Sequence, residues 1–214
     1  CRQCKRPLCV RGCPVGIDIP AFIREVAEGN FPAAARALKE QNMLPAICGR
    51  VCPQETQCEG VCILGNRDAP IRIGAIERFV ADWERANGPD LPEVAKPTGR
   101  RVAVVGSGPA GLTAAAELAR AGHAVTIFES LHEAGGVLTY GIPAFRLPKD
   151  VVKAEIDQVL ALGARLKKNH VVGRSIGVDE LLSYDAVFLA TGAGLPAFMG
   201  IPGENLAGVY SANE

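Results

Sequence analysis

Apolar residues recur at three- and four-residue spacing in the first part of the chain and in short unbroken runs in the second part. The helical spacing covers residues 19–26, where Asp18 can cap a helix, and returns at residues 71–86. Unbroken apolar runs at 102–105 and 124–128 fit buried strands. The pattern therefore predicts a helical region followed by an α/β region.

The remaining elements follow from the same patterns. Helices are predicted at 31–42, 109–121, 149–162 and 178–182, strands at 164–167 and 184–190, and an extended stretch at 170–173. The segment 131–148 is rich in Gly and Pro and is too irregular for a regular element. The uncharged run 186–203 contains prolines and glycines that would break a membrane-spanning helix. It is predicted to be a buried strand followed by a loop, without membrane insertion.

One charged residue falls on an apolar stripe. Glu77 lies four residues after Ile73 and three before Val80, on the apolar side of the predicted helix 71–86. A buried carboxylate needs a partner, because an unpaired buried charge is costly. Alternatively, Glu77 lies at the edge of the stripe and reaches water. The spacing leaves both interpretations open.

Residues 101–129 carry a glycine motif in the setting of a dinucleotide-binding βαβ unit. A predicted strand enters a turn with Gly106, Gly108 and Gly111, a helix follows, and a second strand ends on Glu129. The interval from the last glycine to the acid is close to the ~20 residues that such a unit requires. The turn would then bind a pyrophosphate at the helix N-terminus, and the acid would accept hydrogen bonds from a ribose. A glycine turn without a nucleotide is the alternative.

Two cysteine quartets lie near the start of the chain. They are Cys1, Cys4, Cys9 and Cys13, and then Cys48, Cys52, Cys58 and Cys62. The first has the spacing C-x2-C-x4-C-x3-C-P, which is similar to the ferredoxin pattern in which the fourth cysteine ligates the other cluster. Thiolates select iron–sulfur clusters or zinc over hard cations, so the quartets suit two four-iron clusters. Disulfides and structural zinc are the alternatives, although nothing here indicates export and the first quartet lacks two separated C-x2-C pairs.

The composition favours a globular protein of two modules. The chain has 214 residues, 48% of them hydrophobic, with 23 basic and 23 acidic residues. It can bury a core, and its neutral balance does not favour binding to nucleic acid. All cysteines precede the glycine motif, and the proline-rich stretch 88–99 is the predicted linker. Because the chain begins on a motif cysteine without an initiator Met, we expect a fragment or processed product; no signal peptide is visible, and the expected location is cytoplasmic.

Five segments occur in an order that points to one family. They are CRQCKRPLCVRGCPV, CGRVCPQETQCEGVC, APIRIGAIERF, VVGSGPAGL and GGVLTYGIPAFRLP. The chain resembles, over essentially its whole length, the family of the NADPH-dependent glutamate synthase small subunit. This family includes the N-terminal part of dihydropyrimidine dehydrogenase and the large subunit of NADH-dependent ferredoxin:NADP oxidoreductase. The resemblance implies an α-helical domain with two [4Fe-4S] clusters at 1–87, a linker at 88–99, and the N-terminal part of a Rossmann-like FAD-binding domain at 100–214.

The resemblance also implies the cluster ligands. One cluster would be bound by Cys1, Cys4, Cys9 and Cys62, and the other by Cys13, Cys52, Cys58 and Glu77. The last of these is the Glu or Gln of an I-G-x-[LI]-[EQ]-x-F segment. A simple count of eight thiolates for eight sites would then be wrong, and Cys48 would be a buried bystander.

For FAD, the resemblance implies a site built from several segments. The pyrophosphate would lie on Gly106, Gly108, Pro109 and Ala110, and the ribose on Glu129. The rest of the site would be formed by Gly136, Val137, Leu138, the side chain of Arg146, the backbone of Val172 and a second glycine turn ending on Gly192. Family members bind NADP(H) in a further nucleotide domain, which this sequence does not contain.

The implied function is electron transfer between FAD and the two clusters. The expected partner is a larger catalytic subunit or a ferredoxin- or flavin-linked subunit. No side chain is needed as an acid or base, so we expect no catalytic residue. A carboxylate in place of a thiolate should make the clusters inequivalent. The alternative is a non-catalytic docking module, in which zinc or degenerate clusters stabilise the fold and the chain binds a larger partner.

Overall fold

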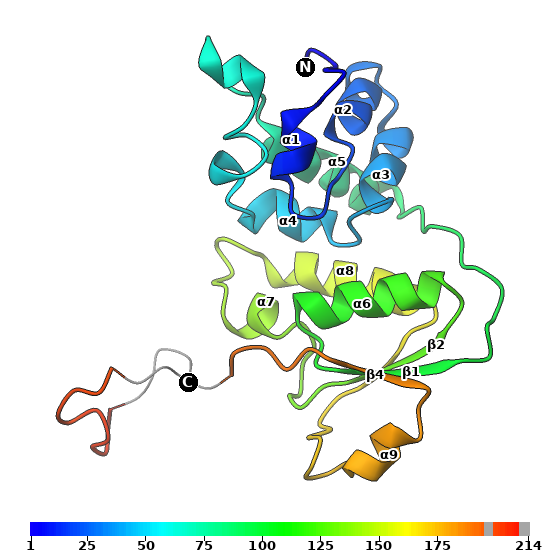
Figure 1. Cartoon of the computed structure of the whole chain (residues 1–214), viewed down its shortest axis with the longest axis vertical. Coiled ribbons are helices and arrows are strands. Elements are labelled where there is room, and N and C mark those ends of the chain that lie inside the picture. Colours follow the sequence, from blue (N-terminus) through cyan, green and yellow to red (C-terminus); the bar gives the residue numbers. More distant parts are fainter. Residues whose placement is uncertain (195–198, 210–214) are drawn as a thin grey trace.

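The computed structural model describes residues 1–194 and 199–209, and its helices up to residue 87 form one part of the molecule (Figure 1). The elements of this helical part are α1 (Leu8–Gly12), α2 (Ile19–Ala27), α3 (Phe31–Lys39), α4 (Pro45–Val51), the 3-10 turns η1 (Gln54–Thr56) and η2 (Ile63–Asn66), and α5 (Ile73–Asn87). The predicted helical region is confirmed. The short helices α1 and α4 were not predicted, because five and seven residues are too few to show a clear period.

The N-terminus of α2 is capped by Asp18 as its sequence predicts, and the N-terminus of α3 is capped by Asn30, which was not predicted as a cap. The Asp18 carboxylate accepts a hydrogen bond from the Ala21 amide (3.1 Å), and the Asn30 side chain accepts one from the Ala33 amide (3.4 Å). Such caps satisfy N–H groups that have no partner within the helix. The apolar faces of α2, α3 and α5 meet in one buried cluster that includes Phe22, Leu38 and Val80.

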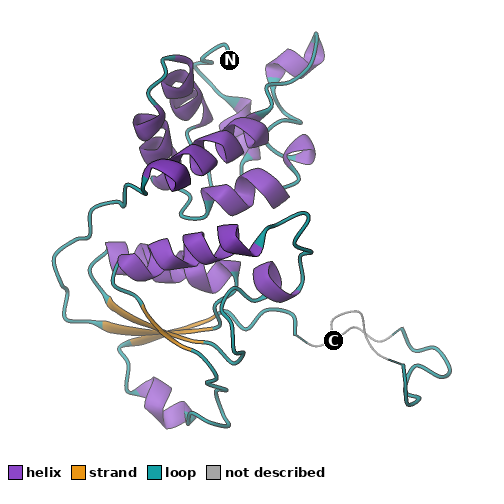
Figure 2. Cartoon of the chain, turned by 180° about the vertical axis from the view of Figure 1, so that it is seen from behind, coloured by secondary structure: helices purple, strands orange, loops and turns teal. Residues whose placement is uncertain are grey.

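The second part of the chain forms a parallel sheet with helices on both faces. Its elements are β1 (Arg101–Val105), α6 (Pro109–Arg120), β2 (Ala124–Phe128), α7 (Val137–Tyr140), α8 (Lys149–Ala161), β3 (Arg165–Lys167), α9 (Val178–Leu182) and β4 (Ala186–Leu189). The strand order is β3-β2-β1-β4, and every pairing is parallel. Helices α6 and α8 cover the face toward the helical part, and α9 lies on the other face (Figure 2). Parallel strands end at the same edge, so Gly106, Glu129 and Ala190 are brought together there.

In the α/β part, helix α7 and the stretch 170–173 differ from the sequence prediction. Helix α7 lies within the segment expected to be irregular, and its four residues are too few for a periodic signal. The stretch 170–173 is not extended throughout. The Arg174 and Ser175 amides donate to the Val171 carbonyl (3.0 and 2.9 Å), and these hydrogen bonds close a turn.

Strand β4 is not buried, contrary to the prediction from its apolar run. Phe188 is 41% exposed and Leu189 is 70% exposed. Within the described ranges β4 pairs only with β1, so it forms one edge of the sheet. Residues 195–198 of the expected loop, and residues 210–214 at the end of the expected FAD-binding region, lie outside the described residues.

The helical and α/β parts contact each other through buried side chains. One hydrophobic cluster contains Ala46, Ile47 and Ala81 from the first part and Leu112, Val152 and Ile156 from the second. Arg85 pairs with Asp150 of α8 (2.7 Å), and Arg120 donates to the Lys39 carbonyl (3.2 Å). The position of the helical part relative to the sheet is therefore set by α4 and α5 packing on α6 and α8. No helix in the described ranges is long and apolar enough to cross a membrane.

Candidate functional site

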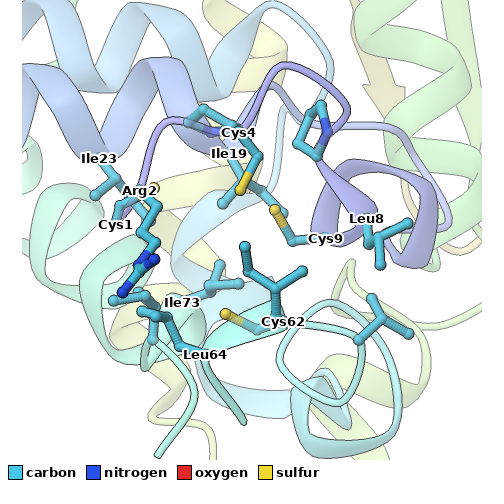
Figure 3. Close-up of a pocket in the computed structure, with 15 residues that line it drawn as sticks. Cys1, Arg2, Cys4, Leu8, Cys9, Ile19, Ile23, Cys62, Leu64 and Ile73 are labelled. Carbon is cyan, nitrogen blue, oxygen red and sulfur yellow. The ribbon is translucent and has the colours of Figure 1, made fainter. Parts of the chain in front are cut away.

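Four of the cysteines line a common pocket in the helical part. Figure 3 shows the thiols of Cys4, Cys9 and Cys62 pointing into the same space, and Cys1 also lines the pocket. Cys62 lies directly before η2, so two segments that are distant in sequence meet at this pocket. The apolar lining includes Ile19, Ile23, Leu64 and Ile73. These four cysteines are the set that the resemblance implies for one cluster.

The other predicted ligands gather around α4 and α5. Cys52 directly follows α4, Cys13 directly follows α1, and Glu77 lies on α5. Cys58 is buried and Cys13 packs against the same hydrophobic cluster, which also contains Ile73 and Val80 of α5. Cys48 on α4 and Glu77 on α5 both contact the Asn42 side chain. Cys48 is therefore a fifth possible donor near this second group.

Glu77 is buried on the apolar face of α5. It is 5% exposed, so the interpretation that places it at the stripe edge in contact with water was wrong. Its Oε1 accepts a hydrogen bond from Asn42 Nδ2 (2.9 Å), and no Lys or Arg of the described ranges forms an ion pair with it. Burial raises the pKa of Glu77 to about 8, the neighbouring Cys52 adds to the rise, and Asn42 opposes it. A buried carboxyl group without a positive partner suits a contact with a metal centre.

Burial also changes the acidity of the thiols. It raises the pKa of Cys9 above its ordinary value, and it raises the pKa of Cys58 to about 12. Because the thiolate is the ligand form, Cys9 and Cys58 must release protons when metal binds.

The candidate donors are free thiols and one carboxyl group. All eight cysteines carry free thiols. Thiolates bind zinc and iron–sulfur clusters alike, so the four-iron clusters stay a prediction of the sequence pattern.

The glycine turn after β1 has close backbone contacts at two positions and open space at a third. Gly106 has φ +101°, and a Cβ there would collide with the Ala190 carbonyl. A Cβ at Gly111 would collide with the Gly106 carbonyl. At Gly108, by contrast, a Cβ would meet no described atom within 4 Å. The first and third glycines therefore serve the packing of the chain, and the second leaves the backbone open to a ligand.

Helix α6 begins directly at this turn. Gly108 is its N-cap, Pro109 its first residue, and no side chain in the described ranges caps it. The uncapped N–H groups of its first turn and the helix dipole both favour an anion. The geometry thus fits the pyrophosphate predicted on Gly106, Gly108, Pro109 and Ala110.

Glu129, at the end of β2, is tied to the glycine turn. Its carboxylate accepts hydrogen bonds from the amide (2.9 Å) and hydroxyl of Ser107, from the Leu131 amide (2.9 Å) and from the Ser130 hydroxyl (3.2 Å). Burial opposes ionisation, but these hydrogen bonds outweigh it and lower the pKa of Glu129. Ser107 also accepts a hydrogen bond from the Gly135 amide (3.0 Å). Ser107 carries no sequence signal of its own, because it is the variable residue of the G-x-G turn.

Helix α7 lies against the same turn. Gly136, its N-cap, has φ +53°, and a Cβ there would lie 3.0 Å from the Gly108 Cα. Within α7, Leu138 is buried and Val137 is exposed. Lys149 Nζ donates a hydrogen bond to the Leu138 carbonyl (2.9 Å) and so fixes α7 to the start of α8. The backbone predicted to line the flavin site is thus next to the predicted pyrophosphate position.

The last three predicted flavin residues lie on loops. Arg146 is exposed between α7 and α8. Val172 packs against the hydrophobic cluster that contains Phe128, at the end of β2. Gly192 has φ +71° and comes two residues after Ala190, which touches the glycine turn. Their contacts with a flavin stay a prediction, as does the contact of Glu129 with a ribose.

Two family models match the chain, one in each part. Residues 1–89 match the dihydropyrimidine dehydrogenase domain II, 4Fe-4S cluster, and residues 100–213 match the pyridine nucleotide-disulphide oxidoreductase family. The glutamate synthase [NADPH] small chain of Escherichia coli K12 is 42% identical over 215 residues, which cover 99% of this chain and 45% of that protein. The chain belongs to the glutamate synthase small-chain and dihydropyrimidine dehydrogenase-like family. The predicted family and fold class are confirmed.

Other members of the glutamate synthase small-chain family are subunits of different oxidoreductases. The NAD-dependent dihydropyrimidine dehydrogenase subunit PreT of Escherichia coli O157:H7 is 39% identical over 92% of this chain and 49% of that protein. The NADP(+)-dependent formate dehydrogenase subunit beta of Moorella thermoacetica is 39% identical over 92% of this chain and 31% of that protein. The chain thus spans half or less of the length of these relatives. What it shares with them is a 4Fe-4S domain followed by a Rossmann-like FAD-binding region.

Proposed function

We propose that this chain carries electrons between an FAD in its α/β part and two [4Fe-4S] clusters in its helical part, toward a partner subunit. The observation that carries the proposal is the juxtaposition of the two parts. The second group of donors lies around α4, and α4 packs directly on α8 of the α/β part. A glycine turn with an open N-terminus of α6 belongs to the same α/β unit.

The proposed ligand sets follow the two groups of donors. The first cluster is held by Cys1, Cys4, Cys9 and Cys62, and the second by Cys13, Cys52, Cys58 and Glu77. The burial of Glu77 without a cationic side chain supports its role as a ligand. In this proposal residues 1–87 form the cluster domain, 88–99 the linker, and 100–214 the FAD-binding region.

FAD and the clusters supply the redox chemistry when bound, and this chain binds and orients them. The first turn of α6 holds the pyrophosphate, and Glu129 lies where a ribose would reach the strand ends. Apolar side chains line the pocket around Cys4, Cys9 and Cys62, where the first cluster would lie. No side chain is assigned as an acid or base.

The nicotinamide substrate and the partner are proposed from the relatives. Their names refer to NADPH, NAD and NADP(+), and to subunits of larger enzymes. We therefore propose that the whole protein exchanges electrons with a nicotinamide nucleotide at the FAD, through a region outside this sequence. The clusters then connect the FAD to a larger subunit.

The test is the metal and flavin content of the anaerobically purified full-length protein. We expect a brown protein with about eight irons and one FAD per chain, because two four-iron clusters are proposed. Replacement of Glu77 by Ala should change or remove one cluster signal in electron paramagnetic resonance and leave the other intact. A colourless protein with stoichiometric zinc would overturn the proposal. Clusters that cannot be reduced and do not respond to Glu77→Ala would favour the docking module instead.

A further inference from the structure

Two candidate fourth ligands lie at the second group of donors. Cys48 lies four residues before the proposed ligand Cys52, and a count of thiols alone would select Cys48 over Glu77. Their side chains come from different helices, α4 and α5. A contact that donates a hydrogen bond to the carboxylate and accepts one from the thiol would favour the carboxylate as the ligand.

Asn42 makes such a contact with both candidates. It is 6% exposed and lies in the turn between α3 and α4. Its Nδ2 donates a hydrogen bond to Glu77 Oε1 (2.9 Å), and its Oδ1 lies 3.7 Å from Cys48 Sγ, which donates to it. One buried amide therefore connects the two competing side chains.

The orientation of this amide is determined by the backbone. Asn42 Oδ1 also accepts a hydrogen bond from the Leu44 amide (3.0 Å), and a backbone N–H can only donate. The oxygen must therefore face Leu44 and Cys48, and the NH2 group must face Glu77. A donor is the group that stabilises a carboxylate, and an acceptor is the group that holds a thiol by its hydrogen.

We infer that Asn42 is a positioning residue that directs Glu77, in place of Cys48, toward the second cluster. The inference rests on the proposed function, because it concerns the ligand set of that cluster. Asn42 occupies Oε1 of Glu77, and no hydrogen bond to its other oxygen is found in the described residues. Groups that orient a ligand by a hydrogen bond are commonly as important for the metal site as the ligand itself.

The substitution Asn42→Asp isolates the contact with Glu77. An Asp has the same shape and keeps an oxygen for the Leu44 amide, so the turn before α4 is retained. It replaces the donor to Glu77 by a second carboxyl oxygen, which repels a carboxylate. We expect Asn42→Asp at alkaline pH, where the new carboxyl is ionised, to lose or shift one of the two cluster signals, with loss of up to about half of the bound iron.

A second substitution should rescue the first. In the double variant Asn42→Asp, Glu77→Gln, the amide of residue 77 can donate to the carboxylate of residue 42 and keep its oxygen for the metal. We expect the double variant to regain the second cluster signal and the lost iron. The matched control is Asn87→Asp, which affects an exposed Asn at the end of α5 that donates to the Trp83 carbonyl (2.8 Å). It should leave both signals unchanged.

The outcomes separate the inference from the proposed function. If the unaltered chain binds no clusters, the proposed function fails, and the inference fails with it. If the unaltered chain shows two cluster signals and Asn42→Asp shows the same two, with the same midpoint potentials, Asn42 does not position Glu77. If Asn42→Asp loses both clusters and Glu77→Gln does not restore them, Asn42 is needed only for folding and the inference is wrong.

Discussion

Glu155 on α8 allows a direct test of how the two parts of the chain are held together. Its Oε1 accepts a hydrogen bond from the Ala46 amide (3.3 Å) in the first turn of α4, across 109 residues of sequence. Helix α4 has no side-chain cap from its own N-cap residue, Leu44. The cap of a helix in the cluster domain is therefore supplied by the FAD-binding region.

The substitution Glu155→Leu removes this cap, and Glu155→Gln keeps an oxygen to accept the hydrogen bond. Loss of a helix cap costs about 0.5–2 kcal/mol, and a buried amide left without a partner costs about 1–3 kcal/mol. We expect Glu155→Leu to be less stable than Glu155→Gln by about 1–2 kcal/mol. Hydrogen exchange of residues 46–47 should be faster in Glu155→Leu only.

The pH dependence of the Gln variant provides a second, independent measurement. Burial raises the pKa of Glu155 from 4.5 to about 8, and the Ala46 amide and Lys39 only partly oppose this. Between these values the folded protein holds a proton that the unfolded chain has lost. The stability contributed by this group is therefore full below pH 4.5 and is lost as the pH rises to about 8.

Residue 155 does not titrate in Glu155→Gln. The variant should therefore become more stable relative to the unaltered chain as the pH rises. The expected slope is about 1.4 kcal/mol per pH unit within this window, a tenfold change in the unfolding equilibrium per unit. The assay is denaturant unfolding of both proteins side by side at several pH values. A difference that does not change with pH would refute the reasoning.

The matched control lies on the same helix. Asp157 is exposed and pairs with Lys153 (2.8 Å) at the protein surface. Exposed pairs of this kind contribute about 0–1 kcal/mol, so Asp157→Asn should change stability little and should not alter exchange in α4. If Asp157→Asn changed stability and exchange as much as Glu155→Leu does, loss of the cap from Glu155 would not be the cause of these changes.

Three further predictions concern other contacts. Gly108→Ala should fold normally, because its Cβ meets no described atom within 4 Å. Its methyl group would occupy the approach to the pyrophosphate, so a flavin fluorescence titration should show FAD binding at least about tenfold weaker. Lys39→Met leaves Glu84 buried without its partner, whose Nζ lies 2.7 Å from the Glu84 carboxylate, and should lower the free energy of unfolding by about 3–5 kcal/mol in chemical denaturation. The double variant Lys39→Met, Glu84→Leu should regain most of this stability. Ser107→Ala removes the hydroxyl that donates to Glu129, and the lost free energy of unfolding of about 1–3 kcal/mol should lower the thermal midpoint by several degrees. An unchanged midpoint would contradict the importance of this hydrogen bond.

The local elements of the fold could be predicted because their causes are local. Asp18 and Asn30 cap α2 and α3, and the glycine turn lies between β1 and α6 as its spacing requires. Each depends on residues within a few positions of one another. The exposure of β4 could not be predicted, because an apolar run looks the same in a central and in an edge strand.

The candidate sites also combine features that the local sequence predicts with features that depend on tertiary contacts. The cysteine spacings and the glycine motif are enough, as sequence patterns, to point to thiolate ligands and a nucleotide. The position of Glu77 on the α5 stripe left two interpretations open, and only its burial beside Asn42 decides between them. Asn42 itself carried no signal, since an Asn after a helix is ordinary in sequence.

The sequence by itself determined the kinds of elements, the types of donor and the family, because caps, periods and motif spacings are properties of neighbouring residues. The tertiary structure alone decided that Asn42 contacts both Cys48 and Glu77, that Ser107 joins the glycine turn to Glu129, and that Glu155 caps α4. These contacts depend on which distant segments lie side by side. The packing of the elements determines which segments meet, and the periodicity of one segment does not predict it.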